Sequence, residues 1–314
     1  MFKPIRLVKK VPNLDFFRFH KLCFALSALL CLGSVVSLAT QGLNFGVDFA
    51  GGILIEVRSP GPANLGDMRS KIGELNLGDV ALQEFGASND VLIRIERQDG
   101  GEQAEMAAVG AVRQALGTGY EYRRVEVVGP KVGAELVTGG ILAVTLSLAG
   151  IMGYMALRFG WRAGLSGVVA ILHDCLTTVG FFSVTQLQFD LNVLAAVVTI
   201  AGFSINDTVV IDDRIRENLR KYKVMPFRQL INRSINETMA RTVVTNGLVF
   251  LAVFALLILG GQVLFGFAVA MTWGVVLGTY STIYVAAPME WYLAGRDTGN
   301  AHRHEDEAPA AAKP

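Results

Sequence analysis

Residues 191–211 read LNVLAAVVTIAGFSINDTVVI, a run of apolar and small residues with a single charge at Asp207. The run is as long as the roughly 20 residues that a helix needs to cross a bilayer. A carboxylate inside a spanning helix costs about 2.5–3.5 kcal/mol on insertion scales, so such residues are uncommon and usually functional. We therefore predict a membrane protein in which Asp207 moves ions or couples to them.

The composition supports a membrane protein. Hydrophobic residues form 52% of the 314 residues and charged residues 18%, against about 25% charged residues in soluble globular chains. The net charge of +1 gives no indication of nucleic-acid binding. Three cysteines, Cys23, Cys31 and Cys175, lie in apolar segments without zinc-site spacing, and no nucleotide-binding or hydrolase motif occurs. We predict no enzyme, no cofactor and no metal site.

Five further apolar runs reach spanning length. We predict transmembrane helices at about 22–40, 135–157, 163–184, 191–211, 242–260 and 264–289. Residues 1–21 precede them, residues 291–314 follow them, and residues 41–134 form one long polar insert between the first two. Pro288 is expected to end the last helix. The predicted fold class is an α-helical integral membrane protein with six spans and one exported α/β domain.

Lysine and arginine residues give the orientation. They are concentrated in residues 1–21, in the short loop after the second span, and in the loop 212–241. The positive-inside rule places all three in the cytoplasm of a bacterial cell, with both termini, and leaves the insert 41–134 in the periplasm. An alternative is a signal peptide cleaved near Ala39. It is disfavoured because the apolar run exceeds the usual length of about 7–15 residues.

The insert 41–134 has the pattern of a small α/β domain. Strand-like stretches occur at 44–58, 80–85, 91–97 and 120–128, and helical stretches at 64–77 and 102–116. This β-α-β-β-α-β order is the ferredoxin-like arrangement. Gly51 and Gly52, within the first strand-like stretch, predict a bulge or a close approach of two backbone segments.

Two polar segments flank the last spans. The loop 212–241 is expected to be helical and amphipathic, with an apolar face that lies along the membrane surface, formed by Phe227, Leu230, Ile231 and Ile235. The tail 291–314 is polar and low in complexity, which predicts disorder. His302 and His304 within it are interpreted as solvated side chains rather than metal ligands.

Arg241 opens the fifth predicted span. If the fourth and fifth helices are antiparallel neighbours, Asp207 and Arg241 lie at similar depth, where contact is plausible. A buried aspartate that loses its arginine partner favours protonation, so Asp207 is a candidate proton carrier. Five polar residues are candidates to line a hydrated path beside the pair: Asn206, Thr208, Thr242, Thr245 and Asn246. The alternative is a static ion pair that stabilises the bundle.

His173 and Asp174 lie near the middle of the third predicted span. A histidine next to an aspartate at that depth suits a proton relay. A polar packing contact between helices explains the pair equally well, so both interpretations stand.

Six motifs together resemble the SecF family, the smaller membrane components of the accessory complex of the bacterial Sec translocase. They are FGVDFAGG (45–52), VGPKVGAEL (128–136), LHD (172–174), SINDTVVIDDRIREN (204–218), RTVVT (241–245) and GTYSTIYVAAP (278–288). They cover residues 43–290 in the family's order. One departure is Asn246, which stands after RTVVT where the family leads us to expect serine.

The resemblance implies half of a transporter of the resistance-nodulation-division superfamily, whose other half is a SecD-like subunit. It implies that the complex uses the proton motive force to promote preprotein translocation and release, working with the SecYEG channel and indirectly with SecA. It also maps the family's functional aspartate and arginine onto Asp207 and Arg241. Two alternatives remain: a proton-coupled small-molecule antiporter of the same superfamily, and a non-conducting scaffold of the translocon.

Overall fold

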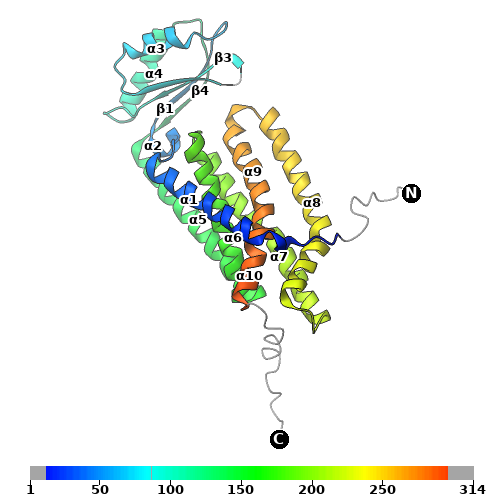
Figure 1. Cartoon of the computed structure of the whole chain (residues 1–314). Helices are drawn as coiled ribbons and strands as arrows, with labels where there is room; N and C mark the ends of the chain where they lie inside the picture. The colour runs from blue at the N-terminus through cyan, green and yellow to red at the C-terminus, as the bar shows by residue number, and fades with distance from the viewer. Residues whose placement is uncertain (1–11, 86, 296–314) are drawn as a thin grey trace, which may run out of the picture.

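A computed structural model describes residues 12–85 and 87–295. Figure 1 shows an α/β domain standing on one end of a bundle of long helices. We call the opposite end of the bundle, where α10 (Ala287–Leu293) and the turn between α7 (Leu191–Lys221) and α8 (Phe227–Leu259) lie, the distal end. The tail residues His302 and His304 lie outside the described residues.

The α/β domain has the predicted element order. It comprises β1 (Gly52–Arg58), α3 (Leu65–Gly73), β2 (Val80–Phe85), β3 (Ala87–Ile95), α4 (Glu102–Leu116) and β4 (Glu121–Val128). The strands form one sheet in the order β2-β3-β1-β4, with every neighbouring pair antiparallel. This is the ferredoxin-like arrangement that the sequence predicts. The helix expected at 64–77 is shorter in the structure, where α3 ends at Gly73.

Alternate residues of the strands build the core of this domain. Ile53, Ile55 and Val57 of β1 lie opposite Ile95, Ile93 and Val91 of β3 and are fully buried, as are Met68 and Ile72 of α3 and Val112 of α4. The period-2 pattern puts these side chains on one face of the sheet, and the two helices cover that face.

The first strand is shorter than the stretch 44–58 predicts. Residues Val47–Ala50 form a helical turn, α2, and β1 begins only at Gly52. Gly51 and Gly52 have φ angles of +74° and +116°, which residues with a Cβ adopt at a cost. A Cβ at Gly52 would lie 2.6 Å from the carbonyl oxygen of Ile95. The predicted close backbone approach is therefore confirmed.

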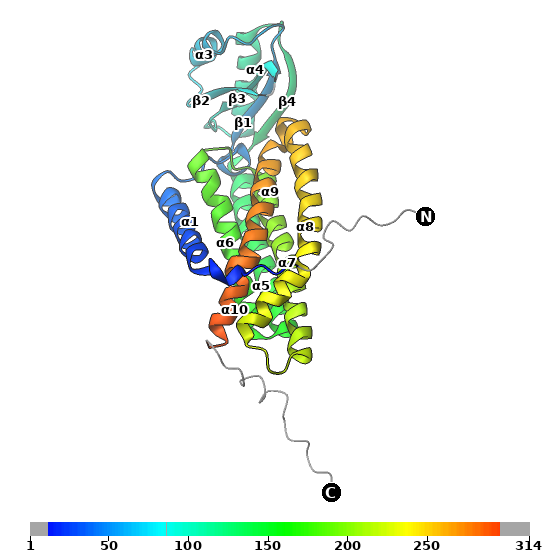
Figure 2. The ribbon, with the colours of Figure 1, turned by 45° about the vertical axis from the view of Figure 1, so that its right-hand side comes forward.

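Within residues 12–85 and 87–295, six helical segments are long and apolar enough to cross a membrane. They are α1 (His20–Thr40), α5 (Pro130–Phe159), α6 (Trp161–Thr185), α7, α8, and a last span made of α9 (Gly261–Ser281), a π-helical turn η2 (Thr282–Ala286) and α10. In Figure 2 α1 stands at the outside of the bundle, where it packs on α6. In the most apolar stretch of α6, 61% of the residues are buried, whereas in that of α5 the share is 0%. α6 and its neighbours α7 and α9 therefore form the interior of the bundle.

The loop 212–241 differs from its prediction. α7 continues to Lys221 and α8 starts at Phe227, so both spanning helices extend beyond their apolar runs and are joined by a short turn. The apolar face expected to lie on the membrane surface is instead buried within the protein. Its residues Phe227, Leu230, Ile231 and Ile235 form a cluster with Phe16, Phe17, Ile211, Ile215, Ile283 and Ala287. The amphipathic pattern was correctly recognised, but its partner is protein.

The last span also differs from its prediction, because Pro288 does not end it. Thr282–Ala286 form a π-helical turn directly before Pro288, and α10 then continues to Leu293. Proline cannot donate the helical hydrogen bond, and a π-helical turn accommodates an altered ladder of backbone bonds. Such turns occur frequently at functional sites.

Candidate functional site

Asp207 lies on the buried face of α7, with 4% of its surface exposed. Asn246 Nδ2 of α8 donates a hydrogen bond of 2.5 Å to Asp207 Oδ2. The same nitrogen donates one of 2.6 Å to Thr279 Oγ1 of α9. A carboxamide nitrogen has two hydrogens, so Asn246 can make both bonds together. Asp207 is therefore held at the junction of three helices.

Arg241 does not pair with Asp207 in this structure. Its side chain is exposed, and among the described residues no ion pair within 4.0 Å joins the two. Arg241 acts on Asp207 as a nearby charge rather than as a bonded partner. Thr245 Oγ1 donates to the carbonyl of Arg241 at 2.9 Å, and Thr242 is buried with no hydrogen bond to its hydroxyl in the described part of the chain.

The two other candidates on α7, Asn206 and Thr208, do not lie beside the Asp207 carboxyl group. Asn206 is exposed and points away from the buried face. Thr208 is 2% exposed and lies 3.3 Å, hydroxyl to hydroxyl, from Thr282 of η2. Successive residues of a helix point about 100° apart, so neighbours in sequence cannot share one face. Of the residues predicted to line a path, Asn246 of α8 is the one that bonds to Asp207 in the described part of the chain.

A second polar cluster surrounds Asp174, which is fully buried on α6. Ser204 of α7 and Ser281 of α9 both donate to its Oδ2, at 2.6 Å and 2.7 Å. His173 Nδ1 lies 2.9 Å from its Oδ1, and His173 Nε2 is buried without a hydrogen-bond partner among the described residues. Asp174 thus joins three helices, as Asp207 does. Ser204 and Ser281 were missed by the sequence reasoning, because single serines in apolar runs carry no distinctive pattern.

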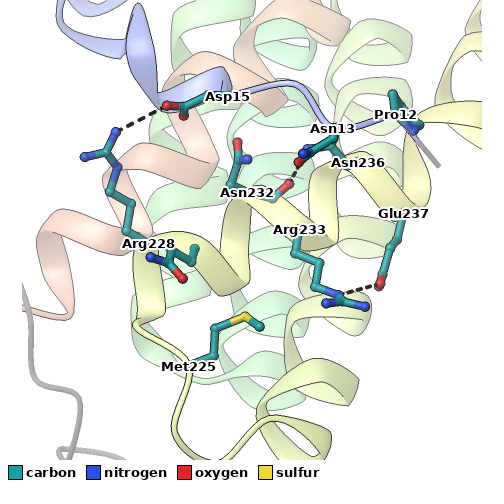
Figure 3. Close-up of a pocket in the computed structure, with 10 residues that line it drawn as sticks. Pro12, Asn13, Asp15, Met225, Arg228, Asn232, Arg233, Asn236 and Glu237 are labelled. Carbon is teal, nitrogen blue, oxygen red and sulfur yellow. Dashed lines mark hydrogen bonds and ion pairs between the residues drawn. The ribbon is translucent and has the colours of Figure 1, made fainter.

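A surface groove with a volume of about 680 Å³ lies elsewhere. Figure 3 shows its lining residues, which come from the segment before η1 (Phe16–Arg18), from Met225 in the turn before α8, and from the first turns of α8. Asn236 donates to the carbonyl of Leu14 and accepts from its amide, both at 2.9 Å. None of the predicted site residues lines this groove. The hydrogen bonds between Asn236 and Leu14 anchor the N-terminal segment to α8.

Among the described residues, no group of three or more His, Cys, Asp or Glu side chains could hold a metal ion. The candidate site therefore consists of two buried carboxyl groups, Asp207 and Asp174, each bonded by uncharged donors from neighbouring helices. Carboxyl groups buried among spanning helices are candidates for proton binding. The chemistry available to this arrangement is the binding and release of protons.

Comparisons with known proteins agree with the family resemblance of the sequence motifs. The family described as "Protein export membrane protein SecD/SecF, C-terminal" matches residues 108–296, and the "SecD/SecF GG Motif" matches residues 36–59. The chain belongs to the SecD/SecF family. The first match contains every predicted site residue, and the second contains Gly51 and Gly52.

Full-length relatives in this family are similar over nearly the whole chain. The protein translocase subunit SecF of Rickettsia felis is 41% identical over 297 residues, which cover 93% of this chain and 96% of the relative. That of Cereibacter sphaeroides is 42% identical over 304 residues, with 94% of each covered.

A solved structure shows the same fold. The crystal structure of SecDF from Thermus thermophilus, a translocon-associated membrane protein, superposes with a TM-score of 0.83 at 31% identity and covers 93% of this chain. The chain spans 40% of the length of that SecDF chain.

Proposed function

We propose that this chain is a subunit of the Sec protein-export machinery in the bacterial inner membrane. With a SecD-like partner it uses the proton motive force to promote translocation and release of preproteins on the periplasmic side. Both termini are cytoplasmic and the α/β domain is periplasmic, in keeping with the distribution of basic residues. It works with the SecYEG channel and indirectly with SecA.

One observation carries the proton-linked part of this proposal. Asp207 is a buried carboxyl group inside a spanning helix, and its only hydrogen bond among the described residues comes from the uncharged Asn246. A purely structural carboxylate in the membrane would be expected to pair with a cation. Arg241 is present on α8 but exposed, which leaves it able to approach Asp207 or move away. A charge that can take either position is what a proton-dependent switch needs.

Asn246 suits both protonation states of Asp207. A carboxylate accepts a hydrogen bond from the amide nitrogen, whereas a protonated carboxyl group can donate to the amide oxygen after the amide rotates. Because Asn246 also bonds to Thr279 of α9, such a rotation changes a contact between α8 and α9. Protonation of Asp207 is thereby linked to helix packing, and through the bundle to the periplasmic domain.

The domain has a direct attachment to the bundle through which movement can pass. Asp48 Oδ2 of α2 accepts from the amide of Leu191 at the start of α7, and the amide of Gly46 donates to the carbonyl of Phe189, at 3.0 Å and 2.8 Å. The first contact joins the base of the α/β domain to the start of the helix that contains Asp207, and the second joins it to Phe189, two residues before that helix. We infer that α7 transmits its state to the domain through them.

Complementation tests the proposal. Cells depleted of the native protein would receive the wild-type chain or Asp207→Asn, with equal membrane levels verified, and preprotein export would be measured. The proposal predicts that Asp207→Asn, which keeps the shape and removes the charge, abolishes the contribution of this chain to export. Full export would instead favour a scaffold without proton coupling. Normal export together with altered drug tolerance would favour a small-molecule antiporter.

A further inference from the structure

A second pocket, with a volume of about 420 Å³, lies where the first and last spans end side by side. α1 begins at His20 and α10 ends at Leu293, and in Figure 2 the dark blue start of α1 stands beside α10. Because two apolar spans end here, the pocket lies at the border between lipid and water. We call it the interfacial pocket. It is lined by Phe17, Arg18, His20, Lys21, Arg228, Trp291 and Tyr292.

Aromatic side chains shape the interfacial pocket. The rings of Phe17 and Trp291 meet edge to face with their centroids 5.6 Å apart, and the His20 ring lies 5.8 Å from that of Trp291. His20 Nε2 is 3.0 Å from the hydroxyl oxygen of Tyr292. These contacts join the start of α1 to α10. Tryptophan and tyrosine are enriched at the level of lipid headgroups, which agrees with the position of the pocket.

Three cations line the interfacial pocket, and their charge exceeds that of the carboxylate beside them. Arg18 and Lys21 are exposed, and neither forms an ion pair within 4.0 Å among the described residues. Arg228 of α8 lies 3.8 Å from the carboxylate of Asp15 and 5.5 Å from the centroid of the Phe17 ring. Asp15 balances one charge, so two positive charges are left over. The pocket therefore favours an anionic ligand.

Exposed apolar side chains begin on α1 directly after Lys21. Leu22, Leu26 and Leu29 are all exposed, and their spacing of four and three residues puts them in one row along the helix. A basic pocket next to an apolar row matches the two parts of a phospholipid, a charged headgroup and its acyl chains. A free phosphate ion matches the pocket but makes no use of the row.

We propose that the interfacial pocket binds the headgroup of an anionic phospholipid, with its phosphate held by Arg18, Lys21 and Arg228 and its acyl chains along the exposed row of α1. Arginine offers paired N–H donors to phosphate oxygens, and lysine a compact point charge. Basic pockets between spanning helices suit acidic headgroups for this reason. A lipid in this place contacts the N-terminal segment, α8 and α10 together, and so stabilises the distal end. The site is independent of the proposed proton coupling.

Thermal unfolding of the full chain in a nonionic detergent tests this site, because a ligand that binds the folded protein raises its melting temperature in a concentration-dependent way. The probes are phosphatidylglycerol, phosphatidylcholine with the same acyl chains, and inorganic phosphate. We expect saturable stabilisation by phosphatidylglycerol at concentrations at which the other two have little effect. Each lysine or arginine near an anionic lipid contributes about fivefold in affinity. Arg18→Gln with Lys21→Gln should therefore weaken the apparent affinity by about 25-fold.

Arg220→Gln with Lys223→Gln is the matched control. Both residues are exposed at the same end of the bundle, at the turn between α7 and α8, and neither lines the interfacial pocket. This control loses the same charge and should keep the wild-type affinity. Arg18→Lys with Lys21→Arg, which keeps both charges, should stay within a few fold of wild type.

Equal weakening in the two double glutamine variants overturns the proposal, because attraction would then depend on the total charge of this end. Absence of stabilisation by phosphatidylglycerol also overturns it, as does equal stabilisation by phosphatidylcholine or by inorganic phosphate. If Arg18→Gln with Lys21→Gln does not accumulate, Lys21→Gln alone replaces it, with an expected loss of about fivefold. Normal export by Asp207→Asn would contradict the proposed function and leave this lipid site unaffected.

Discussion

Asn246 of α8 donates a hydrogen bond of 2.5 Å to Asp207 of α7, and this bond, rather than an ion pair with Arg241, is what holds the intramembrane carboxyl group. The bond places an amide, which can act as donor or acceptor, between the proton-binding candidate and Thr279 of α9. Several measurable consequences arise from this arrangement and from the fold around it.

Replacing Asn246 by alanine should destabilise the bundle and weaken export. The variant leaves Asp207 without its donor, and an unsatisfied buried polar group costs about 1–3 kcal/mol, more when it is charged. We expect a lower thermal midpoint in detergent and reduced proton-dependent export. Asn246→Ser, which supplies a hydroxyl group as a hydrogen-bond donor, should retain more activity. Equal stability and export for Asn246→Ala and wild type would show that the bond has no role.

The two serines on Asp174 should act non-additively. Ser204 and Ser281 donate to the same carboxylate oxygen, so one donor remains when the other is removed. We expect Ser204→Ala and Ser281→Ala each to cost about 1 kcal/mol, and the double variant to cost clearly more than their sum. Thermal unfolding of the four proteins gives the coupling free energy. Strict additivity would mean that Asp174 finds other donors.

Gly52→Ala should destabilise the α/β domain locally. The substitution combines a φ angle of +116°, where a strained backbone costs about 1–3 kcal/mol, with a Cβ only 2.6 Å from the carbonyl oxygen of Ile95. We expect faster hydrogen–deuterium exchange in β1 and β3. Gly110→Ala is the matched control, because no atom lies within 4 Å of its Cβ position and alanine favours the α4 helix. Equal exchange in both variants would contradict this account of Gly52.

Acid should weaken the same domain through Asp90. Arg58 donates from Nε and Nη2 to both oxygens of Asp90 at 2.7 Å, and this bonding holds the pKa of Asp90 below its usual range. Stabilisation by a depressed pKa is complete above the unfolded value of about 3.9 and is lost as the pH falls through the folded value. At neutral pH, Asp90→Asn should therefore speed exchange in β1 and β3 relative to wild type.

The comparison of Asp90→Asn with wild type at each matched pH cancels intrinsic exchange rates. The difference between the two proteins should shrink as the solution becomes acidic. Asp67→Asn, which removes an exposed pair with Lys71 at 2.8 Å, should change little, because exposed pairs contribute little. A difference between Asp90→Asn and wild type that stays constant down to strongly acidic pH would refute this role.

The sequence was sufficient to predict the spans and the domain, because the spans follow from the length of apolar runs and the strands from the alternation of apolar residues. The alternation in β1 and the length of the run at 191–211 fix strand and helix whatever the contacts turn out to be. The face at Phe227, Leu230 and Ile231 was recognised as apolar, but a hydrophobic pattern does not tell membrane from protein. Its true partners, Phe17 and Ile283 among them, come from distant parts of the chain.

The site was predicted only in part, for a similar reason. Asp207 stood out as a charge in an apolar run, whereas its bond to Asn246 depends on the rotation of α8 against α7, which spacing alone does not define. Ser204 and Ser281 converge on Asp174 from two helices and are unremarkable in sequence. Arg241 was expected beside Asp207 because the two lie at similar depth, but its side chain is exposed.

The central claim is that protonation of Asp207 couples the proton motive force to export. Inverted membrane vesicles that contain the SecD-like partner and either wild type or Asp207→Asn would be given a preprotein, with and without an imposed proton gradient. We predict that the gradient accelerates preprotein uptake in wild-type vesicles and has no effect through this chain in Asp207→Asn vesicles at equal protein level. An acceleration of the same size in both would contradict the account.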